Sequence, residues 1–152
     1  IELYRGDAKR IQHFCKVHSY AKLIAETENV DKKCLFIIEA AALTHDIGIH
    51  FCEEKYGNCN GKLQEQEGPA IAERLLEKLG FEKDISERVQ YLIAHHHTYN
   101  NINEIDYQIL VEADFLVNIM EDGLSKEAAL KAYHNIFKTA CGKMICREMF
   151  HI

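Results

Sequence analysis

The stretch that decides the fold is residues 31–48, DKKCLFIIEAAALTHDIG. Asp31 suits the N-cap of a helix, and the apolar crowding from Leu35 to Leu43 is typical of a helix at the centre of a protein. We predict this helix from Lys32 to about His45, and Gly48 ends it. The stretch favours an all-α fold built around this segment.

A helical period continues on both sides, and strand-like alternation is scarce. Further helices are expected over residues 7–26, 69–80, 84–97, 104–120, from Ser125 onward and 143–150, with Asp7 as the first N-cap and Pro69 in the first turn of its helix. Residues 49–66 carry Gly57 and Gly61 and are interpreted as a long loop, a kind of segment that is often functional and here is placed to act as a lid. We therefore predict one all-α domain over residues 1–152, a bundle of about six or seven helices.

Composition restricts the class of protein further. The chain has 152 residues and a net charge of −6, which argues against binding a nucleic acid polymer because that affinity comes largely from Lys and Arg. No apolar run approaches the ~20 residues of a membrane span, and no signal-peptide pattern is present. Six cysteines without a CxxC motif indicate reduced thiols, so we expect a cytoplasmic protein. Cys52 and Cys59, expected in the polar loop, are the one pair worth testing for reactivity, and the oligomeric state stays open.

Two acidic positions stand out for possible chemistry. His45-Asp46 lies at a predicted helix end, where adjacent side chains can converge, and imidazole with carboxylate suits Zn, Fe, Mn or Ni; a purely structural pair is the alternative. Asp114 sits in the apolar run ILVEADFLV (109–117), where a carboxylate must be paired, hydrogen-bonded or bound to a metal. Glu112 lies ~200° away on the helical wheel, so we expect it to face solvent.

The histidines are the second anomaly. His95, His96 and His97 end a predicted helix, and at most two of three consecutive side chains should converge on one site; a solvent-exposed triplet is the alternative. His13 and His18 share the first helix. Periodicity places His18 nearer the apolar face, as a satisfied core histidine, and identifies neither as a ligand.

These segments together resemble the HD superfamily of metal-dependent phosphohydrolases. The matching motifs are RIQH (10–13) with Val17 and Ala21, AAALTHDIG (40–48), LIAHHHT (92–98) and VEAD (111–114). The resemblance covers residues 7–120. It implies an all-α fold in which His13, His45, Asp46 and Asp114 surround one metal, and it selects His13 over His18.

Within the superfamily, EGPA (67–70) followed by His97-Thr98 looks like the bacterial symmetrical diadenosine tetraphosphate hydrolases. Those carry a His where this chain has Glu67. By this resemblance a second ion would lie at Glu67, His96 and His97. Ile49 is another departure, since many members have a Lys there; His50 or Lys62 would have to supply that charge, or the substrate carries less of it.

The resemblance implies hydrolysis of a phosphoester or phosphoanhydride in a small molecule, with a nucleotide as the expected substrate. Asp46 is the expected catalytic residue, and a divalent metal (Fe, Mn, Zn, Ni or Co) the expected cofactor. Lys62, His50 and Tyr99 are the candidates for substrate contacts. Two alternatives stay open: a di-iron oxygenase of the same fold, and a non-catalytic module that binds a metal and a nucleotide.

Overall fold

The computed structural model describes all residues, 1–152, and contains helices but no strands. In chain order the elements are a 3-10 helix η1 (Glu2–Tyr4) and the α-helices α1 (Ala8–Thr27), α2 (Lys32–Thr44), α3 (Ile49–Tyr56), α4 (Gly61–Lys78), α5 (Lys83–Ile93), α6 (Ile105–Glu121), α7 (Lys126–Asn135) and α8 (Ala140–Phe150). The all-α prediction is confirmed, and α3 brings the number of α-helices to eight.

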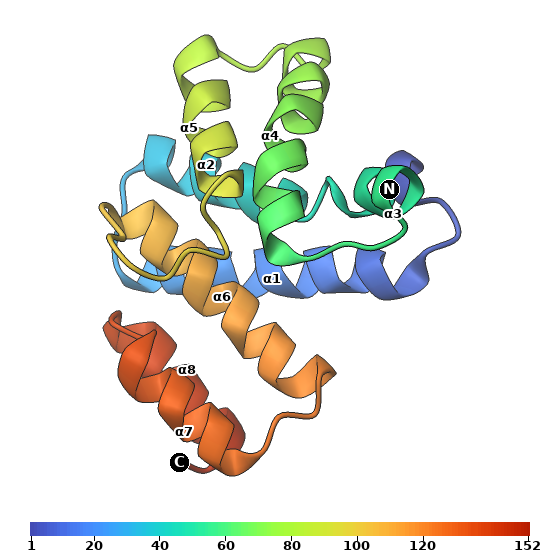
Figure 1. The fold of residues 1–152 in the computed structure, drawn as a ribbon. Coiled ribbons are helices and arrows are strands. Elements are labelled where there is room, and N and C mark those ends of the chain that lie inside the picture. The colour runs from blue at the N-terminus through green and yellow to red at the C-terminus, as the bar shows by residue number, and fades with distance from the viewer.

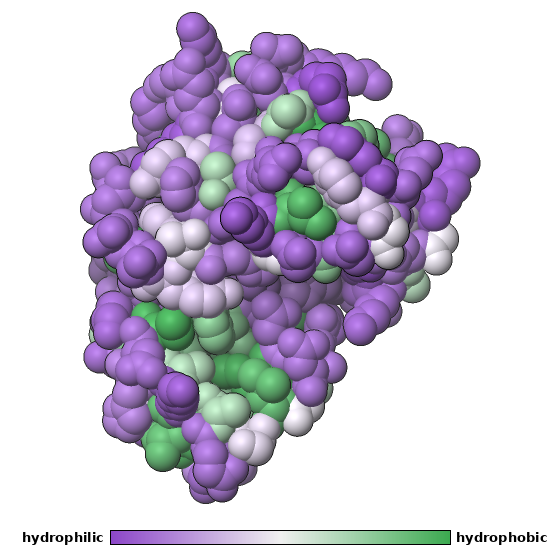
Figure 2. Space-filling view, in the orientation of Figure 1, coloured by the Kyte–Doolittle hydropathy of each residue, from purple (hydrophilic) through white to green (hydrophobic).

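Three long helices form the centre of the molecule. α1 packs against α2 and α6, and α2 also contacts α5 and α6. The α4–α5 pair stands on one side of this centre and the α7–α8 pair on the other, with α8 contacting α6 (Figure 1). Hydrophobic residues gather on the visible face over α6, α7 and α8, whereas the face over α4 and α5 is mostly hydrophilic (Figure 2).

Local capping chemistry sets several helix ends. The side chains of Asp7, Asp31 and Ser125 accept hydrogen bonds from the backbone N–H three residues ahead, as predicted. α4 ends before Gly80, whose φ of +75° is the left-handed conformation that glycine adopts without strain. These helix ends are therefore determined by residues that are close by in the sequence.

The long loop expected over residues 49–66 is absent. Residues 49–56 form α3, which buries Ile49 and Cys52 and ends at Gly57 with a φ of +72°. α4 begins at Gly61 because the Asn60 side chain accepts a hydrogen bond from the N–H of Leu63. Only residues 57–60 connect the two helices, so the segment has little length to act as a lid.

The predicted start of the next helix at Pro69 is also wrong. Pro69 lies inside α4, eight residues after its first, where it removes one backbone donor without ending the helix. Tertiary packing stabilises this part of α4: a Cβ on Gly48 would lie 3.1 Å from the backbone of Gly68. The close approach of these two glycines brings the end of α2 against α4.

Glu112 is fully buried, in contrast to the prediction from the helical wheel. Its carboxylate accepts hydrogen bonds from the Gln108 amide, from the backbone N–H groups of Lys138 and Thr139, and from the Thr139 hydroxyl. Thr139 caps α8. Glu112 therefore ties the α7–α8 pair to α6, a contact that the wheel of one helix cannot reveal.

One segment, Lys32–Tyr56, is long and apolar enough to pass a test for a membrane span, with a mean hydropathy of 1.4 and half of the tested window buried. It consists of two helices with the His45–Gly48 turn between them. Because α2 packs against α1, α5 and α6, the apolar composition is that of a core helix.

Candidate metal centre

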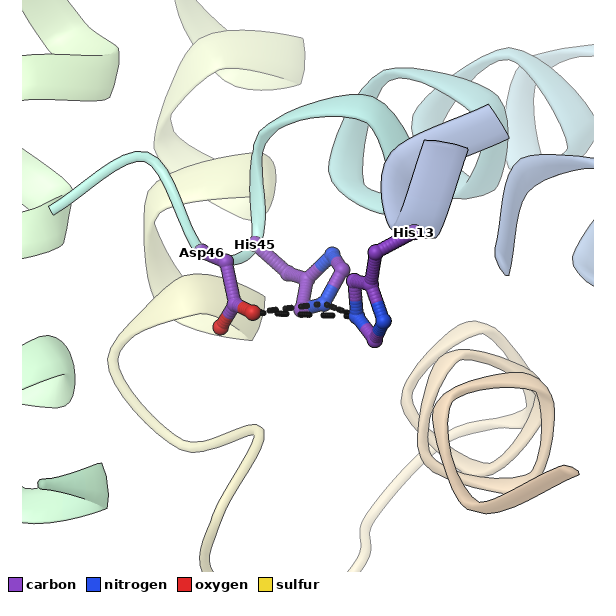
Figure 3. Close-up of side chains that lie close together, drawn as sticks. All are labelled: His13, His45 and Asp46. Carbon is purple, nitrogen blue, oxygen red and sulfur yellow. Dashed lines mark hydrogen bonds and ion pairs between the residues drawn. The ribbon is translucent and has the colours of Figure 1, made fainter. Parts of the chain in front are cut away.

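Four predicted ligands converge where the end of α2 meets α1 and α6. His45 directly follows α2, His13 comes from α1 and Asp114 from α6, and all three are buried. The Nε2 atoms of His13 and His45 lie 3.2 Å apart, and each lies near Asp114 Oδ1, at 3.3 and 3.5 Å. Asp46 Oδ2 is 3.5 Å from His45 Nε2 and 3.7 Å from His13 Nε2. Figure 3 shows the side chains of these three residues pointing toward one another.

The far side of each imidazole is held by a hydrogen-bond acceptor. His45 Nδ1 lies 3.0 Å from the Ala42 carbonyl, and His13 Nδ1 lies 3.0 Å from Glu121 Oε2. Each Nδ1 must then carry the proton, so in the neutral rings both Nε2 atoms point lone pairs at each other. Glu121 also pairs with Lys16 at 2.6 Å, which fixes the carboxylate that orients His13.

This arrangement requires a positive charge at its centre. Asp114 Oδ1 is buried and has no hydrogen-bond partner. Two imidazole lone pairs and two carboxylates meet around it, an arrangement that is costly without a proton or a cation between the groups. The donor set of two imidazoles and two carboxylates fits a divalent transition metal.

The pKa values of His45 and Asp114 also reflect the close approach of these groups. Burial alone would lower the pKa of His45, but the carboxylates of Asp46 and Asp114 outweigh it and raise the pKa to about 9. Burial opposes ionisation of Asp114, yet the neighbouring imidazoles of His13 and His45 lower its pKa strongly. Without a metal, the cluster therefore retains protons that a metal ion would displace.

A second group shares Asp46 with the first. Asp46 Oδ1 lies 3.2 Å from His96 Nε2, and the ligand atoms of Asp46, His96 and His97 lie within 4.8 Å of one another. His96 Nδ1 lies 2.8 Å from the Ile93 carbonyl and donates its proton there, so in the neutral ring Nε2 has the lone pair that could bind a metal. His95 instead points its Nδ1 at the Tyr91 carbonyl, and the structure brings only two of the three histidines to this site.

The position of His97 depends on the first turn of α4. A Cβ on Gly61 would lie 2.7 Å from the His97 ring, so only glycine lets the ring pack there. Burial, followed by the neighbouring His96, lowers the pKa of His97 to about 4, so the ring is neutral at physiological pH. Gln64 Oε1 lies 3.1 Å from His97 Nε2, and Glu65 accepts from the His97 backbone N–H.

The structure does not bring Glu67 into either group. Its carboxylate accepts hydrogen bonds from Tyr56, at 2.5 Å, and from Lys55, at 3.3 Å, and these lower its pKa. One turn earlier in α4, Gln64 is the residue that contacts His97.

The remaining candidate residues are the three predicted to contact substrate. His50 Nε2 lies 3.0 Å from Asp7 Oδ2, and the His50 ring stacks on the ring of Tyr4. Lys62 is exposed on the first turn of α4. The Tyr99 hydroxyl lies 3.4 Å from His97 Nδ1.

His18 is not the core histidine expected from the wheel. It is half-buried, and its Nε2 pairs with Glu39 at 2.9 Å, away from the cluster. Glu121, Gln64, Glu65 and Tyr4, which donates a hydrogen bond to the Asp46 carbonyl, were all missed. Glu121 follows Asp114 by seven residues, two helical turns, and that spacing could have identified it.

The fold and the site define a helical protein with a buried histidine–aspartate centre suited to a divalent metal. Residues 10–139 match the HD domain family, and the chain belongs to this family. A crystal structure described as a predicted HD superfamily hydrolase from an uncultured Thermotogales bacterium is similar, with 25% identity and a TM-score of 0.70 over 99% of this chain and 80% of that one. No curated protein matches the chain.

Proposed function

We propose that this chain is a metal-dependent phosphohydrolase that cleaves a phosphoester or phosphoanhydride, with a nucleotide as its substrate. The observation that carries the proposal is the orphaned Asp114 Oδ1, which faces the Nε2 atoms of His13 and His45. Membership of the HD domain family and the similarity to a predicted hydrolase support the same class of reaction.

His13, His45, Asp46 and Asp114 would hold the metal, which is Fe, Mn, Zn, Ni or Co on the basis of its imidazole and carboxylate ligands. A metal held there supplies Lewis acidity towards a phosphoryl oxygen and lowers the pKa of water. Glu121 and the Ala42 carbonyl keep the two imidazoles aimed at the centre. Asp46 faces both groups of ligands, and we assign it the catalytic role of orienting the attacking water.

A second ion would be held by Asp46, His96 and His97. Glu67 could join only by leaving Tyr56 and Lys55, whereas the amide oxygen of Gln64 already lies beside His97. Gln64 is therefore the better candidate for the remaining oxygen ligand, in place of Glu67.

Two-metal occupancy also suits a di-iron oxygenase, because carboxylate and imidazole ligands are those that iron takes in such sites. Oxygen consumption by the iron-loaded protein would support that alternative. A protein that binds metal and nucleotide but releases no phosphate and consumes no oxygen would be a regulatory module.

The substrate is expected to be a small molecule. The net charge of −6 disfavours a nucleic acid polymer. Tyr99, whose hydroxyl lies 3.4 Å from His97, and the exposed Lys62 are the proposed substrate contacts, and His50 could join them only after leaving Asp7. All six cysteines are free, which is consistent with the reducing cytoplasm.

A matched pair of histidine variants tests the proposal. The protein is stripped of metal, reloaded with Mn, Fe or Co, and assayed for bound metal and for phosphate release from a panel of phosphoesters and nucleotides. His13→Ala should lose both, whereas His18→Ala, five residues along α1, should retain both. Equal metal content and equal phosphate release in the two variants would refute the assignment.

A further inference from the structure

An aromatic pair, the exposed Tyr99 and the partly buried Phe115, lies at the edge of the metal centre. The rings of Tyr99 and Phe115 are 5.0 Å apart in an edge-to-face arrangement. Phe115 directly follows Asp114 on α6, and the Tyr99 hydroxyl reaches to 3.4 Å from His97. The pair therefore lies beside candidate ligands of both groups, Asp114 and His97.

Tyr99 lies beside the candidate ligand His97 and is partly open to solvent. Its hydroxyl lies 3.4 Å from His97 Nδ1, and the residue is 43% exposed. Tyr99 therefore offers an accessible aromatic ring beside the centre.

The two rings differ in their surroundings. Phe115 is partly buried and packs against the hydrophobic core, whereas Tyr99 is exposed and packs on Phe115. Large exposed aromatic side chains outside the core are more often used in binding than in stability, because they offer contact area at little cost in conformational entropy.

Hydrogen bonds anchor the backbone that leads into Tyr99. The Tyr107 hydroxyl donates to the carbonyls of His95 and Thr98, and the Thr98 hydroxyl donates to Glu65 at 3.0 Å. Asn101, two residues further on, adopts a left-handed φ of +58°. An aromatic surface held in place in this way is preorganised for a planar ligand.

We propose that Tyr99 and Phe115 form a subsite that stacks on the base of a nucleoside phosphate, and that this contact selects nucleotides over sugar phosphates. The proposal rests on the proposed function, because the phosphate is taken to lie at the metal centre. Stacking suits this site because any base presents a π face, and the aromatic pair brings no formal charge of its own.

The test compares two ligands that differ only in the base, adenosine 5′-monophosphate and ribose 5-phosphate. Binding to the metal-loaded protein is measured by calorimetry, and kcat/KM is measured where turnover occurs. The wild type should bind the nucleotide roughly tenfold more tightly or better, the scale of one base–aromatic stack. Tyr99→Ala should abolish this difference, Tyr99→Phe should retain it, and Tyr133→Ala, a tyrosine on α7, should leave it unchanged.

Equal affinity of the wild type for the two ligands would overturn the subsite, as would a Tyr99→Ala variant that keeps the wild-type ratio. Phe115→Leu provides a second test. Loss of the ring that packs against Tyr99 should reduce the ratio of the affinities for the nucleotide and for ribose 5-phosphate, without removing metal. A protein that binds the two ligands with the predicted ratio but hydrolyses no phosphoester would refute the proposed function and leave the subsite intact.

Discussion

Replacing Glu112 with Ala should destabilise the fold without touching the metal centre. The Glu112 carboxylate is fully buried and accepts four hydrogen bonds, from Gln108, from the backbone of Lys138 and from both the backbone and the hydroxyl of Thr139. Each buried donor left without an acceptor costs about 1–3 kcal/mol, so losing the acceptor of four such bonds should cost about 3–5 kcal/mol after partial relaxation. For a chain of this size the melting temperature should fall by roughly 6–20 °C.

Urea and thermal unfolding followed by circular dichroism measure this loss. Glu148→Ala is the matched control, because the Glu148 side chain is 70% exposed and its substitution should change the free energy of unfolding by less than about 0.5 kcal/mol. A loss below about 1 kcal/mol for Glu112→Ala would refute the reasoning that this carboxylate holds α7 and α8 to α6. The variant should still bind metal at temperatures where it is folded.

Three further predictions concern the centre and the thiols. His45→Ala should abolish metal retention while the helical content stays near that of the wild type; normal metal content in the folded variant would contradict this. In the metal-free protein, the pKa of His45 is about 9, above its usual 6.5. Protonation of His45 therefore stabilises the folded state fully below pH ~6.5, and this stabilisation is lost as the pH rises through 9. A metal ion, in contrast, binds only the neutral ring. The rise in melting temperature on adding Mn should therefore grow between pH 6 and 9, and a rise that shrinks over this range would argue against His45 as a ligand. Cys52 and Cys59 should both titrate as free thiols in the native protein, and a bridge between them in protein isolated under reducing conditions would contradict the proposed cytoplasmic location.

The parts of the site that depend on one segment could be predicted from sequence. Asp114 stands in an apolar run, where an acid needs a partner, and Gly48 marks the helix end that lets His45 and Asp46 converge. The choice of His13 over His18 needed the family resemblance. Both flank the same apolar face of α1, and only the packing of α2 and α6 determines which of them is enclosed.

The parts that depend on contacts between distant segments could not be predicted. Glu112 is buried by residues 26 and 27 positions later, which the wheel of its own helix cannot include. Whether Glu67 or Gln64 faces the histidines depends on where α4 begins. That start depends on the Asn60 cap, which was interpreted as part of a loop.

The most direct test of the central claim is anomalous scattering at the Mn edge from crystals grown with excess Mn. A peak is expected within coordination distance of His13, His45, Asp46 and Asp114, and a second peak beside His96 and His97 would lie about 3.5–4 Å from it. Crystals that show no peak among the first four side chains, with Asp114 still facing the two imidazoles, would contradict the proposed metal centre.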